Sequence, residues 1–194
     1  MREKVASALR GQWARGMRFG LAAAFLCGCA FALSGCKMFV KEEPPPCPRV
    51  SILADAASLT RFRSGPGRDI TDVALQAKVA DYHGECRYDK DKRIMTLALK
   101  VGFDVQRGAA LREDKTSLRY FISVPTFYPY DGAKKVLTTE VEFPEHRDLM
   151  HVVDKEVELD FPVRSLKELE RYEIFIGFQL DPAELDYNRT HPQH

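Results

Sequence analysis

Two histidines and a group of acidic residues are the part of this chain whose types and spacing best fit metal chemistry. His146 and His151 stand five residues apart, beside Glu142, Glu145 and Asp148. Imidazole and carboxylate groups bind zinc, which can activate water for hydrolysis. A predicted turn separates the two histidines, and side chains on a charged surface turn do not have to converge. We therefore predict no metal site and no cofactor, and a metal-dependent hydrolase is only the third functional hypothesis.

The motif His146-Arg147-Asp148-Leu149 has the residue order of the protein-kinase catalytic loop, but its context does not fit that use. The kinase loop needs an asparagine five residues after the aspartate, and Val153 occupies this position. No Asp-Phe-Gly motif accompanies it, and no serine lies in the Gly-x-Ser-x-Gly pattern of an activated nucleophile. The residues predict a protein that is not an enzyme, with this motif in a charged turn between strands.

Residues 1–35 have the organisation of a secretory signal peptide. Five basic residues precede an uncharged stretch from Leu21 to Leu33, and Leu33-Ser34-Gly35-Cys36 follows at its end. These 13 apolar or small residues are too few to span the hydrocarbon of a bilayer, which takes about 20. Met17 begins a self-sufficient signal and is a possible true start of the protein.

Leu33-Ser34-Gly35-Cys36 resembles the lipobox of bacterial lipoproteins. The resemblance implies that the Cys36 thiol receives a diacylglycerol, that residues 1–35 are removed and that the new N-terminus is acylated. Several acyl chains hold a protein on a membrane stably. In such lipoproteins an aspartate directly after the cysteine resembles an inner-membrane retention signal, but this chain has Lys37 there. The resemblance therefore favours an outer-membrane anchor facing the periplasm. The open alternative is ordinary signal-peptidase cleavage, with Cys36 a chance residue.

Removal of the leader changes the charge of the chain and its pool of cysteines. The mature chain has 24 Lys and Arg against 27 Asp and Glu, a net charge of −3, so nucleic acid is not an expected partner. Once Cys36 is acylated, Cys47 and Cys86 are the two remaining thiols. The implied compartment is oxidising, so we predict a disulfide between them. Two free thiols or a metal pair are the alternatives.

After the anchor, residues 36–46 are expected to form a proline-rich tether, residues 47–187 a β domain and residues 188–194 a flexible tail. Apolar and polar residues alternate in most of the domain, which predicts strands. About seven such runs occur: 50–53, 73–79, 95–105, 118–124, 137–143, 153–163 and 172–180. Clean alternation is typical of antiparallel sheets with one packed face, so we predict an antiparallel β-sandwich, with a small closed barrel as the alternative.

The predicted connections include a loop over 54–70 and a turn at His83-Gly84. Near the C-terminus, Leu166 precedes Tyr172 by six residues at the start of the last strand. This spacing resembles the tyrosine corner of immunoglobulin and fibronectin type III domains and implies that the tyrosine hydroxyl bonds back to the preceding loop. Asp181, Pro182 and Glu184 then suit the first turn of a short C-terminal helix.

Two surfaces are candidates for interaction. The first is basic and lies in the predicted early loop, where Arg61, Arg63 and Arg68 surround Phe62. We expect the tether to hold it near the membrane, where it can meet lipid phosphate or an acidic partner. The alternative is a solvated loop. The second surface is an aromatic stretch that Pro125 and Pro129 interrupt, and it consists of Tyr120, Phe121, Phe127, Tyr128 and Tyr130. Proline cannot donate to a strand ladder, so we predict that this strand lies at a sheet edge. Its aromatic side chains are alternatively part of the core.

Over its length the chain also resembles a group of proteobacterial lipoproteins with a PRVSILADA-type segment, here 48–56, and a GFQL…YNR segment, here 177–189. That resemblance implies an envelope location and no catalytic residue. The leading hypothesis is a membrane-anchored, non-catalytic interaction or assembly module with an envelope protein as its partner. The second hypothesis is a carrier or sensor of a small apolar ligand, held inside the sandwich or barrel.

Overall fold

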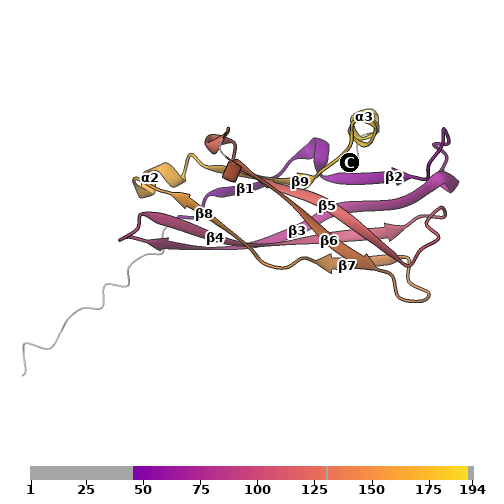
Figure 1. Cartoon of the computed structure of the whole chain (residues 1–194), viewed down its shortest axis with the longest axis horizontal. Helices are drawn as coiled ribbons and strands as arrows, with labels where there is room; N and C mark the ends of the chain where they lie inside the picture. Colours follow the sequence, from indigo (N-terminus) through magenta and orange to yellow (C-terminus); the bar gives the residue numbers. More distant parts are fainter. Residues whose placement is uncertain (1–45, 130, 192–194) are drawn as a thin grey trace, which may run out of the picture. The chain divides into compact units, whose positions relative to one another are not determined.

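The computed structural model describes residues 46–129 and 131–191, which form two β-sheets with one short helix at an end and another alongside β2 (Figure 1). The strands of this part are β1 (Arg49–Ile52), β2 (Ser58–Phe62), β3 (Val73–Asp89), β4 (Ile94–Arg107), β5 (Lys115–Ser123), β6 (Lys134–Glu142), β7 (Leu149–Val153), β8 (Val157–Pro162) and β9 (Glu173–Phe178). The helices are α2 (Leu166–Leu169) and α3 (Pro182–Thr190), and single 3-10 turns are η1 (Ala54–Ala56), η2 (Ile70–Asp72), η3 (Pro125–Phe127) and η4 (Asp131–Ala133).

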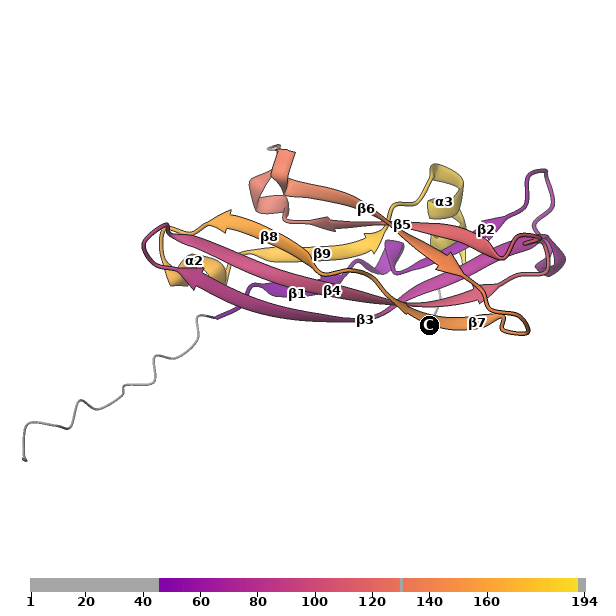
Figure 2. The ribbon, with the colours of Figure 1, turned by 60° about the horizontal axis from the view of Figure 1, so that its bottom comes forward.

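The two sheets stack as the layers of a sandwich (Figure 2). The first has the strand order β1-β9-β5-β6, and the second has the order β2-β3-β4-β7, with β8 also paired to β4. Because β3 occupies one side of β4, β7 and β8 share its other side, β7 along 102–106 and β8 along 94–99. The pairs are antiparallel, except that β1 and β9 run parallel. The predicted all-β sandwich is confirmed, and the described strands form no closed barrel.

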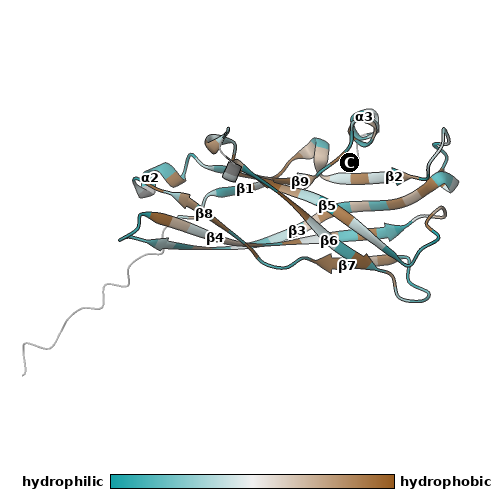
Figure 3. Ribbon diagram, in the orientation of Figure 1, coloured by the Kyte–Doolittle hydropathy of each residue, from teal (hydrophilic) through white to brown (hydrophobic). Residues whose placement is uncertain are grey.

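Alternation along the strands builds the core (Figure 3). Six side chains of β4, each at most 1% exposed, face the other sheet: Met95, Leu97, Leu99, Val101, Phe103 and Val105. The Phe103 ring centroid lies 5.0 Å from that of Tyr120 in β5 and 5.5 Å from that of Phe178 in β9. Rings from both sheets therefore meet between the layers, and these buried side chains fill the space there.

Two of the predicted connections are wrong. The expected loop 54–70 contains strand β2, in which Leu59 pairs with Ala77 and is 2% exposed. The expected turn at His83-Gly84 lies inside β3, a strand of 17 residues. Gly84 pairs with Leu99, and a Cβ on Gly84 would lie only 3.3 Å from a methyl group of Leu97. The glycine therefore gives room to side chains of β4 and does not turn the chain.

The predicted run 153–163 is divided between two strands. β7 ends at Val153 and β8 begins at Val157. Between them, the Asp154 N–H donates to the Val101 carbonyl at 3.0 Å, and the Asp154 carboxylate accepts the Tyr120 hydroxyl at 2.8 Å. The chain therefore stays against β4 at this point, although the strand is interrupted.

A disulfide between Cys47 and Cys86 joins the two sheets at one edge, as predicted. Cys47 precedes β1 of the first sheet, whereas Cys86 belongs to β3 of the second. The Tyr82 hydroxyl of β3 donates to the Val50 carbonyl of β1 at 2.8 Å, so β1 and the residues just before it are linked to β3 twice. A disulfide that closes a loop of 39 residues stabilises a fold by about 4 kcal/mol on the chain-entropy model.

Helix α3 begins as its sequence predicts and extends three residues beyond the expected end of the domain at 187. The Asp181 carboxylate accepts the Glu184 N–H, and the Glu184 carboxylate accepts the Asp181 N–H, which forms a capping box. Asn188 is buried and donates to the carbonyls of Asp55 and Ser58. Among the described residues, we find no helix with the length and apolar character needed to cross a bilayer.

Candidate functional site

His146 and His151, the two histidines considered above for metal chemistry, have different surroundings in the structure. His146 is exposed in the turn before β7, with a positive φ of 64°. His151 lies on β7, where its Nδ1 donates to Asp104 Oδ1 at 2.9 Å and its Nε2 is 3.7 Å from Asp81 Oδ2. Within residues 46–129 and 131–191, no three His, Cys, Asp or Glu side chains form a group that could hold a metal ion.

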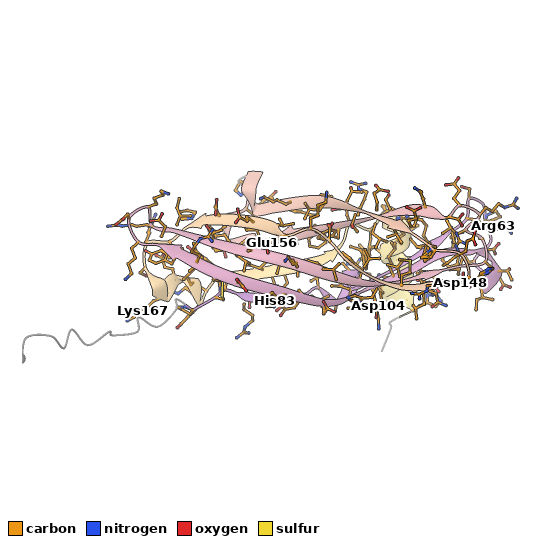
Figure 4. All side chains as sticks on the ribbon, turned by 90° about the horizontal axis from the view of Figure 1, so that it is seen from below. Arg63, His83, Asp104, Asp148, Glu156 and Lys167 are labelled. Carbon is orange, nitrogen blue, oxygen red and sulfur yellow. A yellow bond between two sulfur atoms is a disulfide. The ribbon has the colours of Figure 1, made fainter. Side chains whose placement is uncertain are left out.

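His151 instead belongs to a polar network on the outer face of the second sheet, where Figure 4 labels Asp104. Asp104 also pairs with Lys78 Nζ at 3.2 Å, and the hydrogen bonds from His151 and Lys78 lower the pKa of this carboxyl. Gly102 lies beside the network, and a Cβ there would be 2.5 Å from Asp81 Oδ1. The absence of a side chain at Gly102 therefore lets Asp81 and His151 approach each other across the sheet.

Arg61, from the predicted basic surface, connects three elements of the fold. Its Nε donates to Glu184 Oε1 of α3 at 3.4 Å, and one of its terminal nitrogens donates to the Ser117 carbonyl of β5 at 3.3 Å. Because Glu184 also caps α3, Arg61 links the start of that helix to both sheets. This arginine is therefore already engaged inside the domain.

The other two arginines of that surface order the loop between β2 and β3. Arg63 pairs with the buried carboxylate of Asp72, and the Asp69 backbone N–H together with Arg63 lowers the pKa of Asp72. Arg68 donates to the carbonyls of this loop, and its guanidinium lies 5.1 Å from the Phe62 ring centroid. The basic surface is thus a structured loop with satisfied charges.

This loop and the disulfide lie at opposite ends of β3. The loop leads into Val73, the first residue of the strand, whereas Cys86 is near its last residue, Asp89. A strand rises about 3.3 Å per residue, so roughly 40 Å separate the two positions. Figure 4 labels Arg63 at one end of the domain and Lys167 of α2 at the other. Cys47, which is bonded to Cys86, is therefore at the end with α2, and the arginine loop is at the other end.

The predicted aromatic edge is not an edge. β5 lies between β9 and β6, and its Tyr120 and Phe121 are 0% and 9% exposed. Pro125 and Pro129 come after β5, which ends at Ser123, so neither proline interrupts a ladder. Tyr120 and Phe121 therefore belong to the buried part of the sandwich, which was the alternative to a recognition surface.

The aromatic residues after β5 divide between a packed and an exposed position. The Phe127 ring centroid lies 5.2 Å from that of Tyr172 and 6.1 Å from that of Phe161. Tyr128, the next residue, is 80% exposed. Tyr130 lies outside the described residues. Of the three aromatic candidates, Tyr128 is the one that the structure places in solvent.

Phe127 and Tyr172 line an open pocket of about 420 Å³, called here the aromatic pocket. Its lining includes Phe127, Pro162, Arg164, Glu168, Arg171 and Tyr172. Arg164 and Arg171 are exposed, so the lining combines aromatic rings with two basic side chains.

Tyr172 also makes the backward hydrogen bond that the tyrosine-corner resemblance implies. Its hydroxyl donates to the Pro162 carbonyl at 3.4 Å, ten residues upstream. Burial, and to a smaller extent the charge of Glu168, raises the pKa of Tyr172. Leu166 is the first residue of α2, in the segment that this hydrogen bond spans.

A second candidate site lies on strand β7, and sequence reasoning missed it. Its outward residues Leu149, His151 and Val153, called here the β7 edge, alternate with the half-buried Met150 and Val152. Leu149 and Val153 are 68% and 55% exposed. The alternation of apolar residues on both faces of a five-residue segment was the available signal, because a strand with two apolar faces needs a cover on each.

The backbone of the β7 edge is also unpaired. Asp148 and Asp154 bond to β4 through Arg107 and Val101, just before and just after β7. Backbone groups point to alternate sides of a strand, so the N–H and C=O groups of the β7 edge point away from β4. No other described strand pairs with β7.

A shallow groove of about 450 Å³ on the outer face of the second sheet ends at the β7 edge. Its lining is largely polar and includes Thr60, Gln76, Lys78, Asp104, Gln106 and Leu149. The exposed apolar edge and this polar groove therefore form one continuous outer surface.

Comparisons with protein-family models, with curated proteins and with solved structures gave no match.

Proposed function

We propose that this chain is a membrane-anchored envelope lipoprotein whose sandwich is a non-catalytic protein-interaction module. Cys36 is the lipid anchor, and the domain faces the periplasm from the outer membrane. The partner is another envelope protein, which docks on the β7 edge. The proposal needs no cofactor.

The observation that carries the proposal is the coincidence of exposed apolar side chains and unpaired backbone on one strand. Exposed strand edges are templates for pairing with a second chain, and many soluble domains protect them with lysine or proline. The β7 edge has neither at its three positions and presents Leu149 and Val153 instead. Such an edge suits an added strand, in which backbone bonds supply affinity and alternate side chains supply specificity.

The chemistry of the surroundings defines the segment that fits. Two apolar side chains of the partner would cover Leu149 and Val153, four residues apart on one face. Between them, a polar side chain would meet His151 and the groove that contains Lys78 and Asp104. We therefore expect an extended segment with apolar residues at both ends and a polar residue at its centre.

Photo-crosslinking in intact cells tests this function. A photoreactive residue at position 149 or 153 should capture a reproducible envelope protein, because both side chains lie on the proposed interface. In otherwise wild-type protein carrying the probe at 149, the substitution Val153→Lys should strongly reduce the yield, because it places a charge on the edge.

The matched control is Val136→Lys, on β6. Val136 is also an exposed apolar residue, 45% accessible, on the edge strand of the other sheet. It should leave the crosslink unchanged. An equal loss in both variants, or no captured protein with the probe at either position, would contradict the proposal.

The carrier hypothesis is supported less well than the interaction module. Side chains such as Phe103, Tyr120 and Phe178 occupy the space between the sheets, where a carrier would hold its ligand. Native mass spectrometry of protein purified from its own envelope distinguishes the two functions. A carrier should retain a small ligand, whereas an interaction module should give the mass of the acylated chain alone.

The anchor can be tested separately. We expect the mature protein to begin at Cys36 and to carry acyl chains, which mass spectrometry of its N-terminal peptide measures. The variant Cys36→Ser should lose these acyl masses. An unmodified Cys36 peptide from wild-type cells would contradict the lipoprotein assignment.

A further inference from the structure

The aromatic pocket lies at the end of the sandwich that carries the disulfide. Cys86 is three residues from the end of β3, beside the hairpin that leads into β4. The Arg93 carbonyl in that hairpin accepts the Val163 N–H at 2.8 Å, directly before the pocket residue Arg164. Cys47, which is bonded to Cys86, therefore lies at the same end as the pocket.

The charges of the pocket leave two cationic groups for a ligand. Within residues 46–129 and 131–191, the guanidinium groups of Arg164 and Arg171 make no ion pair or hydrogen bond. The acidic residue of the lining, Glu168, is half-buried, and its Oε2 accepts the Arg164 backbone N–H at 3.0 Å. Its charge is therefore directed at the backbone just before α2, and two arginines remain available to an anion.

We propose that the aromatic pocket binds the phosphate of an anionic lipid headgroup and so sets the orientation of the domain on its membrane. This inference rests on the proposed anchor at Cys36. Eleven tether residues reach at most about 35 Å, which keeps the Cys47 end of the domain close to the bilayer. The pocket is at this end, whereas the arginine loop after β2 is at the other.

The surroundings of the pocket fit a lipid surface. Tyr128 follows the pocket residue Phe127 and is 80% exposed, and tyrosine is enriched where membranes meet water. Lys167 on α2 is also exposed (Figure 4) and lies between the two pocket arginines in sequence. Cations close to an anionic leaflet attract its headgroups. The phosphate would pair with Arg164 and Arg171 while Tyr128 enters the headgroup layer.

Hydrogen exchange of the full mature protein in nanodiscs tests this site. One set of discs contains phosphatidylcholine alone, and the other contains phosphatidylcholine with about one third phosphatidylglycerol. Incorporation into either disc depends on the acyl anchor and therefore reports on the proposed function. Phosphatidylglycerol should slow exchange in 126–129 and 164–172 at least threefold in the wild-type protein, and leave β4 unchanged.

The double variant Arg164→Glu/Arg171→Glu should lose this protection. The control Arg112→Glu/Arg147→Glu makes the same change of charge at two exposed arginines near the other end of the sandwich, and it should keep the protection. Equal exchange in the two discs, or an equal loss in the control, would overturn the proposal. Protection by inorganic phosphate in phosphatidylcholine discs would also overturn it, because the site would then bind a soluble anion.

Discussion

The hydroxyl of Tyr120 donates a hydrogen bond of 2.8 Å to the carboxylate of Asp154 and so connects the two sheets across the core. Tyr120 belongs to β5 in the first sheet and is 0% exposed, whereas Asp154 lies between β7 and β8, along the second sheet. The hydroxyl therefore meets its acceptor where the edge of the second sheet is interrupted. This contact explains why a polar residue breaks a run that otherwise reads as one strand.

Removal of this hydroxyl should destabilise the fold. In Tyr120→Phe, the Asp154 carboxylate loses a donor in a half-buried position, and the loss of one partner of such a bond costs about 1–3 kcal/mol. Urea unfolding followed by circular dichroism should show a lower midpoint with an unchanged slope. Tyr172→Phe is the control, because its hydrogen bond is longer at 3.4 Å, and it should cost less than Tyr120→Phe. Equal costs would contradict the special role of the Tyr120 contact.

Stability should fall in alkaline solution because of the same tyrosine. Burial, and then the hydrogen bond and charge of Asp154, raise the pKa of Tyr120 above its ordinary value of 10.0. Above pH 10 the unfolded chain releases this proton while the folded chain keeps it. The unfolded state is thereby favoured, and the free energy of unfolding falls by up to about 1.4 kcal/mol per pH unit.

The measurement is the free energy of unfolding between pH 9 and pH 11.5 for the wild-type protein and for Tyr120→Phe. All other ionisable groups are the same in both proteins, so the difference between the two slopes isolates the tyrosine. The variant should lose stability less steeply above pH 10. Parallel curves for the two proteins would show that the Tyr120 proton is not linked to folding.

The disulfide should contribute more to stability than any single hydrogen bond. The double variant Cys47→Ser/Cys86→Ser opens a loop of 39 residues, and we expect it to lose about 4 kcal/mol. The wild-type protein in a strong reductant should reach the same midpoint in urea, because both treatments remove the same crosslink. If reduction leaves the midpoint unchanged, the crosslink does not stabilise the fold by restricting the unfolded chain.

The sandwich was predictable from sequence because its central strands have a long and regular period. In β4, every second residue from Met95 to Val105 faces the core, and the strand has partners on both sides. β2 has five residues, which is too short for the same period to stand out from a loop. Gly84 was wrongly predicted to form a turn, because the sequence does not distinguish a glycine that permits close packing from a glycine that permits a turn.

The candidate sites were less predictable, since both depend on topology. The aromatic pocket joins Phe127 to Arg164 and Arg171, which no local pattern brings together. The β7 edge is an edge because β8, and not a further strand, continues along β4. Tyr120 and Phe121 gave the opposite error, because prolines beyond the end of a strand resemble prolines within it.

A substitution at Gly108 should show how much the close approach of the β3 backbone restricts this position. A Cβ on Gly108 would lie 2.1 Å from the Val73 carbonyl oxygen, and the Gly108 N–H is itself held by the Ala74 carbonyl at 3.0 Å. Neither the Val73 carbonyl nor the Gly108 backbone can move away without disturbing the start of β3. Gly108→Ala should therefore cost about 1–3 kcal/mol in urea unfolding, as overpacking does.

Gly132→Ala provides the matched comparison for Gly108→Ala. Nothing lies within 4 Å of a Cβ placed on Gly132, and its φ is not in the left-handed region. An alanine there removes freedom from the unfolded chain and should leave stability equal or raise it by up to about 1 kcal/mol. Because the two variants add the same methyl group, their difference measures the contact with Val73. Equal midpoints would show that the chain after β4 can shift away from β3 without cost.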